Sequence, residues 1–68
     1  MNKIKIVLKE QGRMQSYLAD KLDKSANTIS LWCRNVVQPS IWDLYKVADL
    51  LDCEIDELLV KKDDLKNN

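Results

Sequence analysis

The chain has 68 residues and a hydrophobic fraction of 46%, so we expect a single domain with a small hydrophobic core. Because it has only one glycine and one proline, a helical fold is favoured over a turn-rich all-β fold. Its formal net charge is zero, which by itself argues against a nucleic-acid-binding protein. The charge is unevenly distributed, however, because residues 1–40 carry seven basic and three acidic residues, whereas residues 41–60 carry one basic and six acidic residues. This asymmetry indicates one face suited to an anion, although two ordinary solvated surfaces would give the same counts.

The first two predicted elements are short amphipathic helices. Apolar residues recur at helical spacing over residues 3–11, and Gly12 is placed to end this helix as its C-terminal cap. Ile6 lies off the apolar stripe, so we expect it to be partly exposed. A second helix is predicted over residues 15–22, with an inner face of Leu18, Ala19 and Leu22.

Two further helices begin at serine residues that can act as N-caps. Ser25 begins a helix to about residue 34, in which Ile29 and Trp32 face the core. After a loop closed by Pro39, Ser40 begins a helix with the strongest amphipathic pattern in the chain, formed by Ile41, Leu44, Val47, Ala48 and Leu51.

Trp42 lies just off that stripe, near Tyr45. We expect partial burial by local packing, and the alternative is exposure for a contact with a second subunit or with a DNA backbone.

A short fifth helix is predicted around residues 55–59, and the polar tail at residues 61–68 is expected to fray. The predicted fold is therefore all-α, a compact bundle of five short helices, with residues 1–60 as the domain.

The second and third helices are the informative pair. A very short polar turn joins residues 15–22 to the helix that follows Ser25, and helices joined in this way cross at a steep angle as a helix-turn-helix. The third helix has one apolar edge and one edge of small or hydrogen-bonding side chains. The major groove is about 12 Å wide and admits a helix with such a slim edge.

The chain resembles the lambda-repressor-like, or XRE, family of helix-turn-helix regulators from about residue 4 to residue 60. Five blocks carry the resemblance in order and at family spacing, namely QSYLADKL (15–22), SANTISLW (25–32), QPS (38–40), LYKVA (44–48) and IDELL (55–59). The resemblance implies a DNA-binding transcriptional regulator whose third helix reads the base edges.

The resemblance also implies roles for individual residues. Gln15 matches a glutamine that binds a DNA phosphate and braces the recognition helix, and Asn27 is the expected principal reader because its amide can pair with adenine N6 and N7. Arg34 is a candidate for phosphate contact. The predicted DNA-binding residues are Gln15, Ser25, Ala26, Asn27, Thr28, Ser30, Leu31 and Arg34.

Some positions depart from the family pattern. Ala26, Leu31 and Cys33 stand where charged or long polar side chains are usual, and residues 35–37 replace a loop that is often basic. Fewer cations near phosphate predict weaker binding, because each neutralised phosphate contributes counterion release.

The sequence thus predicts a sequence-specific binder of double-stranded DNA, acting as a repressor and as a homodimer on a near-palindromic site. The dimer interface is predicted at Leu58, Leu59 and Val60, which exceed what one small core needs. The alternative is a protein-binding module, such as the antitoxin of a toxin–antitoxin pair, whose acidic half suits a basic toxin or other protein partner.

Catalysis and cofactor binding have no support in the sequence. The chain lacks histidine and has only Cys33 and Cys53 as thiols, so it cannot supply the four nitrogen or sulfur ligands of a structural zinc site. We therefore expect no enzyme, no metal and no cofactor. Without a signal peptide or a membrane-length apolar run, a cytoplasmic protein with reduced thiols is expected.

Overall fold

The computed structural model describes residues 1–60, which form four α-helices and one turn of 3-10 helix. The elements are α1 (Ile4–Gln11), α2 (Gln15–Leu22), α3 (Ala26–Cys33), α4 (Ile41–Leu50) and η1 (Ile55–Leu58). The predicted all-α bundle is confirmed, but its fifth element is a single 3-10 turn. The tail at residues 61–68, with its expected fraying, lies outside the described residues.

The fifth element stays short because the chain leaves it for an extended conformation. Leu59 has φ −111° and ψ 143° and forms an antiparallel bridge with Asn2. The N–H of Lys3 also donates to the carbonyl of Leu58 at 2.7 Å. This pairing with the N-terminal segment leaves room for only one helical turn after Glu54.

The helix boundaries follow local cap chemistry. Gly12 has a φ of 67°, in the left-handed region that glycine tolerates. The hydroxyl of Ser25 accepts the N–H of Thr28 at 3.0 Å, and the hydroxyl of Ser40 accepts the N–H of Asp43 at 3.1 Å. All three predicted caps are confirmed, and the predicted helix ends lie within a residue or so of the observed ones.

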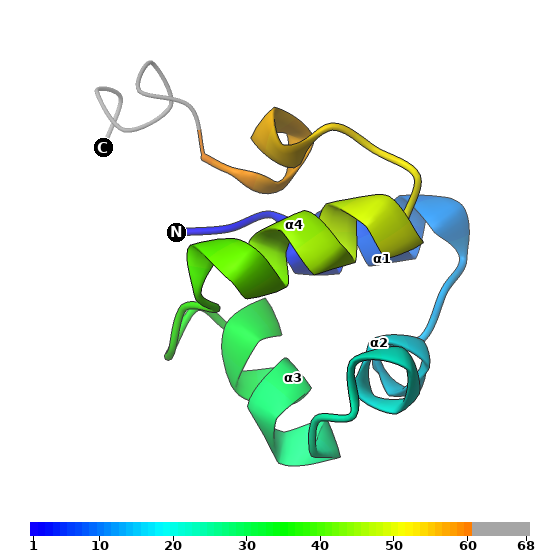
Figure 1. Cartoon of the computed structure of the whole chain (residues 1–68), viewed down its shortest axis with the longest axis vertical. Helices are drawn as coiled ribbons and strands as arrows, with labels where there is room; N and C mark the ends of the chain where they lie inside the picture. Colours follow the sequence, from blue (N-terminus) through cyan, green and yellow to red (C-terminus); the bar gives the residue numbers. More distant parts are fainter. Residues whose placement is uncertain (61–68) are drawn as a thin grey trace.

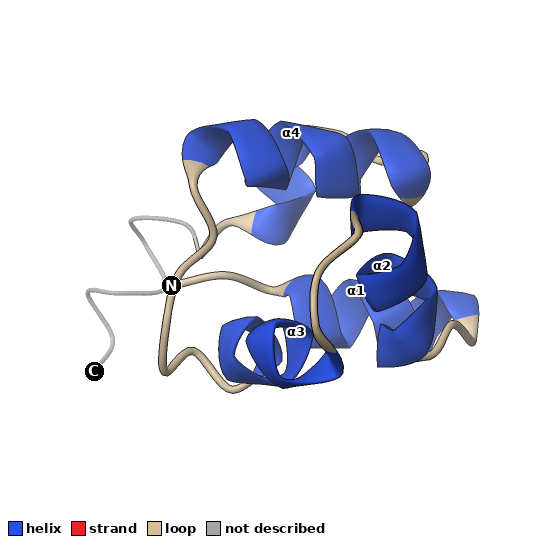
Figure 2. Cartoon of the chain, turned by 60° about the horizontal axis from the view of Figure 1, so that its bottom comes forward, coloured by secondary structure: helices blue, strands red, loops and turns tan. Residues whose placement is uncertain are grey.

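One hydrophobic core lies between the helices. Figure 1 shows α3 at the lower edge of the molecule with α2 beside it and α4 above it, and α1 lies behind α4. Figure 2 again places α3 and α4 on opposite sides of the bundle. The buried apolar residues come from every element, and they are Ile4, Leu8, Leu18, Ile29, Trp32, Cys33, Leu44, Val47, Ala48, Leu51 and Leu58.

A polar cluster, here called the Asn2 clasp, joins the N-terminus to the end of α3 and consists of Asn2, Asn35 and Gln38. Asn2 is 5% exposed, and its amide donates to the carbonyl of Trp32 at 3.0 Å and to Gln38 Oε1 at 2.8 Å. Its Oδ1 accepts the N–H of Ile4 at 3.0 Å. Asn35 exchanges two further bonds with the Asn2 backbone, at 2.8 and 3.2 Å. No local sequence pattern predicts this cluster, because Asn2 is more than thirty residues from Asn35 and Gln38.

Trp42 contradicts the expectation of partial burial, because 74% of it is exposed. The inner face of α4 is formed by Leu44, Val47 and Ala48. Two residues correspond to about 200° around a helix, so Trp42 lies nearly opposite Leu44 and points to solvent. Ile6 is 54% exposed, as expected from its place off the stripe of α1.

Candidate nucleic-acid interface

The tight connection between α2 and α3 positions the candidate interface. Asp23 ends α2 with a φ of 54°, and the N–H of Lys24 donates to the carbonyl of Ala19 at 3.0 Å. Ser25 then begins α3 directly, so the chain reverses within residues 23–25. Figure 1 shows α3 running away from the end of α2 along the edge of the molecule. This is the helix-turn-helix arrangement that the sequence predicts.

The helix α3 divides into a buried side and an outer side. Ile29, Trp32 and Cys33 are buried against the rest of the bundle. The outer side carries the residues predicted to contact DNA: Ala26 and Asn27 are exposed, and Thr28, Ser30 and Leu31 are half-buried. The outer side therefore presents small or uncharged side chains to solvent.

The cap of α3 engages two of the predicted contact residues. Besides accepting the backbone N–H, the Ser25 hydroxyl lies 2.9 Å from the hydroxyl of Thr28. These two side chains fix the first turn of α3. Asn27, by contrast, makes no side-chain hydrogen bond within residues 1–60 and lies in that fixed turn, so its amide is available to a ligand.

Gln15 lies half-exposed at the start of α2. The preceding residue, Met14, provides no side-chain cap, so the first N–H groups of α2 are open to an incoming acceptor. Within the described residues, the Gln15 amide has no partner. The Gln15 side chain and the N-terminus of α2 can together donate hydrogen bonds to a phosphate.

Arg13 belongs to the same edge, although it is not among the residues predicted from the sequence to bind DNA. Its guanidinium lies 4.5 Å from the ring centroid of Tyr17, and its Nε donates to Gln11 Oε1 at 3.0 Å. The sequence feature that could have indicated this contact is the spacing of four residues between Arg13 and Tyr17. Both contacts hold this cation beside Gln15.

Other cations lie near α3, among them Lys5 of α1. Burial raises the pKa of the Cys33 thiol, and the charge of Lys5 opposes this rise. Arg34 is exposed at the C-terminal cap of α3, whereas Lys24 lies 3.9 Å from the carboxylate of Asp43 and is partly neutralised. The interface is thus weakly positive, in line with the expectation of modest affinity for a polyanion.

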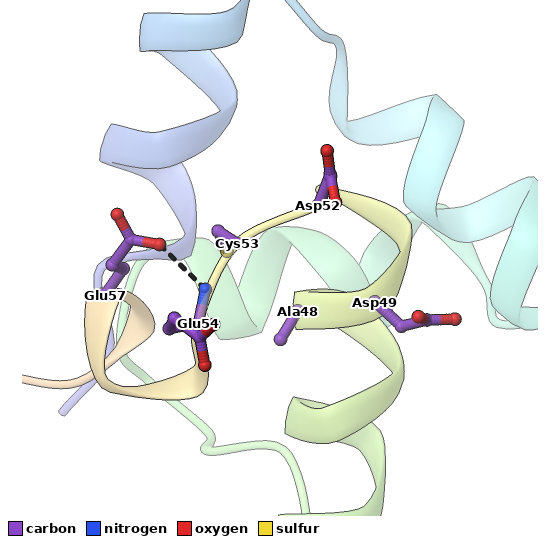
Figure 3. Close-up of a pocket in the computed structure, with 6 residues that line it drawn as sticks. All are labelled: Ala48, Asp49, Asp52, Cys53, Glu54 and Glu57. Atoms are coloured by element: carbon purple, nitrogen blue, oxygen red, sulfur yellow. Dashed lines mark hydrogen bonds between the residues drawn. The ribbon is translucent and has the colours of Figure 1, made fainter.

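One group of acidic residues lies at the C-terminal end of α4 and around η1, on the other side of the bundle from α3 (Figure 1), and it consists of Asp49, Asp52, Glu54, Asp56 and Glu57. A hollow of about 200 Å³ lies there, and Figure 3 shows the residues that line it, which are Ala48, Asp49, Asp52, Cys53, Glu54 and Glu57. Burial, and then the carboxylates of Glu57 and its neighbours, raise the pKa of the Cys53 thiol. The thiol therefore stays protonated at neutral pH, which disfavours a nucleophilic or redox role.

Across residues 1–60, no group of three or more histidine, cysteine, aspartate or glutamate side chains is arranged to hold a metal ion. In the same part of the chain, no helix has the length and apolar character needed to cross a membrane.

The residues predicted for a dimer interface occupy different environments. Leu58 is fully buried, because η1 packs it into the core of its own protomer, and this removes it from the predicted interface. Leu59 is 36% exposed, and Val60 is half-buried with its N–H 3.4 Å from the carbonyl of Met1.

Comparison with known proteins agrees with this architecture. The family model described as Helix-turn-helix matches residues 4–58. A crystal structure of a protein from Bacteroides fragilis, provisionally described as DNA-binding, is similar at 48% sequence identity and a TM-score of 0.84, over 85% of this chain and 94% of that one. No curated protein matches the chain significantly. The chain therefore belongs to the XRE-type helix-turn-helix family.

Proposed function

We propose that this protein binds double-stranded DNA in a sequence-specific manner and regulates transcription, acting in the cytoplasm as a repressor that covers promoter DNA. The observation that carries this proposal is the outer side of α3, where the unpartnered amide of Asn27 stands on a slim, rigidly capped helix. A helix of this kind fits the major groove, where the base edges differ most.

Base reading is assigned to the exposed first turn and a half of α3. The Asn27 amide can donate to adenine N7 and accept from adenine N6 at the same time. Ser30 can donate or accept at the next turn, and Leu31 and Ala26 can meet a thymine methyl group. A short footprint follows, because α3 has only eight residues.

Phosphate contacts position the helix. Gln15 and the start of α2 bind one phosphate, with Arg13 beside them, and Arg34 binds another at the far end of α3. These groups flank the reading residues, and they set the register of α3 without carrying sequence information. A near-palindromic site would then present two such surfaces to two copies of the protein, one turn of DNA apart.

The test compares two variants on a site obtained by random-oligonucleotide selection with the wild-type protein. Asn27→Ala should cost about 1–3 kcal/mol at the selected site and relax the preference at one base pair, whereas Arg34→Ala should weaken binding to all sequences alike and reduce the salt slope by about one. Asp56→Ala, on η1, is the control and should bind as wild type. Equal losses on selected and random DNA for Asn27→Ala would contradict its role as reader.

A second candidate function is recognition of a basic protein, such as the toxin of a toxin–antitoxin pair. The hollow in Figure 3 supports it, because Asp49, Asp52, Glu54 and Glu57 line it on the side away from α3. A salt series on random duplex separates the two functions. A DNA binder loses affinity with a log–log slope of about −0.9 for each phosphate contact, and a pure protein adaptor shows no binding.

A further inference from the structure

One exposed apolar surface has no role in the proposed DNA contact. It is here called the Trp42 face, and it comprises the first turns of α4 and the loop that leads into them. The exposed fractions are 51% for Ile41, 74% for Trp42 and 55% for Tyr45, with 62% and 48% for Val36 and Val37. Ile41, Trp42 and Tyr45 adjoin one another at helical spacing. Figures 1 and 2 place the loop and the start of α4 at the same end of the molecule.

The size of the Trp42 face sets it apart from scattered surface residues. Aromatic side chains have roughly 150–250 Å² each to bury, so the exposed parts of these five side chains amount to roughly 400–600 Å². The largest patch on an ordinary monomer is about 300–600 Å² and is often functional. A 60-residue domain has a much smaller surface than such a monomer, so its Trp42 face is a large share of it.

The surrounding structure holds these side chains in solvent. Asn35 has a φ of 60° and is bonded to Asn2, while the Gln38 amide donates to Asn35 Oδ1 at 3.1 Å. This part of the Asn2 clasp fixes the backbone on both sides of Val36 and Val37. The Ser40 cap fixes the first turn of α4 in the same way. A rigid apolar surface loses little conformational entropy when it is covered, which favours association.

Charge argues against DNA as the occupant. Interfaces with DNA are much more positive than those between proteins, and the charged residues next to the Trp42 face in the sequence are Arg34, Asp43, Lys46 and Asp49, two of each sign. This near-neutral rim does not repel a second copy. Two copies joined here would bury roughly 800–1,200 Å² in total, at the low end for a specific but transient association.

The position of the face also suits a pair of DNA-reading helices. It adjoins the C-terminal end of α3, so a two-fold axis through it leaves Asn27 of both copies uncovered. Two half-sites one turn of DNA apart need about 34 Å between the two reading helices, and this is the spacing that a complex of two copies must meet.

We infer that the Trp42 face is the surface through which two copies of this protein associate. This inference adds a dimer interface to the proposed function, and the part of its test that uses DNA rests on that proposed function. It replaces the interface predicted around Leu58, and it gives the exposed tryptophan a partner in the equivalent face of a second molecule.

The test measures self-association of the full chain by sedimentation over a wide concentration range, alone and with duplexes carrying one or two selected half-sites. Trp42→Ser should raise the dimer Kd by about 30-fold, the scale of an interface hot spot, and Tyr45→Ser by about 10-fold. Ile6→Ser is the matched control, since Ile6 is 54% exposed against 55% for Tyr45, and it should change Kd less than about 2-fold. Acrylamide quenching of Trp42 should fall as the wild-type dimer forms.

Each outcome decides the inference. It is overturned if the wild type is monomeric at every concentration and binds two half-sites without cooperativity, or if Trp42→Ser and Ile6→Ser associate equally well. A dimer that Trp42→Ser dissociates, in a protein that binds no duplex, supports the Trp42 face and contradicts the proposed function instead. Circular dichroism of each variant confirms that the fold is kept.

Discussion

Asn2 offers the sharpest test of how the end of α3 is held. We predict that Asn2→Ala destabilises the protein although it removes only a small polar side chain near the N-terminus. The substitution leaves the buried N–H of Ile4 without its acceptor at 3.0 Å. It also removes the bonds to the carbonyl of Trp32 and to the Gln38 amide.

The size of the effect follows from what each partner can do afterwards. The Trp32 carbonyl still accepts the N–H of Asn35 at 3.0 Å, and the exposed Gln38 side chain can turn to water. The Ile4 N–H has neither option, and a buried unsatisfied donor costs about 1–3 kcal/mol, with about 1 kcal/mol for each hydrogen bond lost. We therefore expect a loss of about 2–3 kcal/mol, which is a large share of the stability of so small a domain.

The assay is urea unfolding, followed by tryptophan fluorescence, with hydrogen exchange at the amides of residues 32–38. A thermal scan should show Tm lowered by roughly 10–20 °C. Gln38→Ala is the control: it removes an exposed side chain that accepts from the Asn2 amide and donates to Asn35 Oδ1, where water can take its place, and it should cost about 1 kcal/mol or less. If Asn2→Ala unfolds within about 0.5 kcal/mol of wild type, an amount typical of neutral surface changes, the clasp does not stabilise the fold.

Three further predictions concern the caps and the acidic hollow. Ser25→Ala should cost about 1 kcal/mol in the free energy of unfolding, because the first turn of α3 loses its cap, and an unchanged urea midpoint would contradict this. Gly12→Ala should lower the free energy of unfolding by about 1 kcal/mol because of the φ of 67° alone, since nothing lies within 4 Å of an added Cβ. Gly12→Asn should recover part of this loss, because asparagine tolerates the left-handed region better than alanine. An equal loss for both variants would refute the backbone explanation. Alkylation of Cys53 by iodoacetamide needs the thiolate, so its raised pKa should shift the rate–pH profile upward from that of a free thiol. Glu57→Gln should move this profile back toward lower pH, and an identical profile for the variant would count against the carboxylate effect.

The helices, their caps and most of the core could be predicted from the sequence, because they depend on neighbours within about four positions. Ser25 and Ser40 each bind an N–H three residues on, and Gly12 occupies the turn that directly follows α1. The exposure of Asn27 follows from the same local periodicity, since Ile29 and Trp32 orient α3. The tight turn at residues 23–25 likewise predicts the helix-turn-helix from the sequence alone.

Only the tertiary structure decided the features that depend on contacts between distant parts of the chain. Asn2 is buried because it meets Trp32 and Gln38, some thirty residues away, and no pattern of spacing announces such a contact. The pairing of Asn2 with Leu59 shortens the last element to one 3-10 turn and buries Leu58. Trp42 could be placed off the stripe of α4 by periodicity, but its exposure depended on no other element covering that side. Local hydrogen bonds and helical periodicity depend on residues close together in the sequence, whereas the burial of a side chain depends on which distant parts of the chain pack against it.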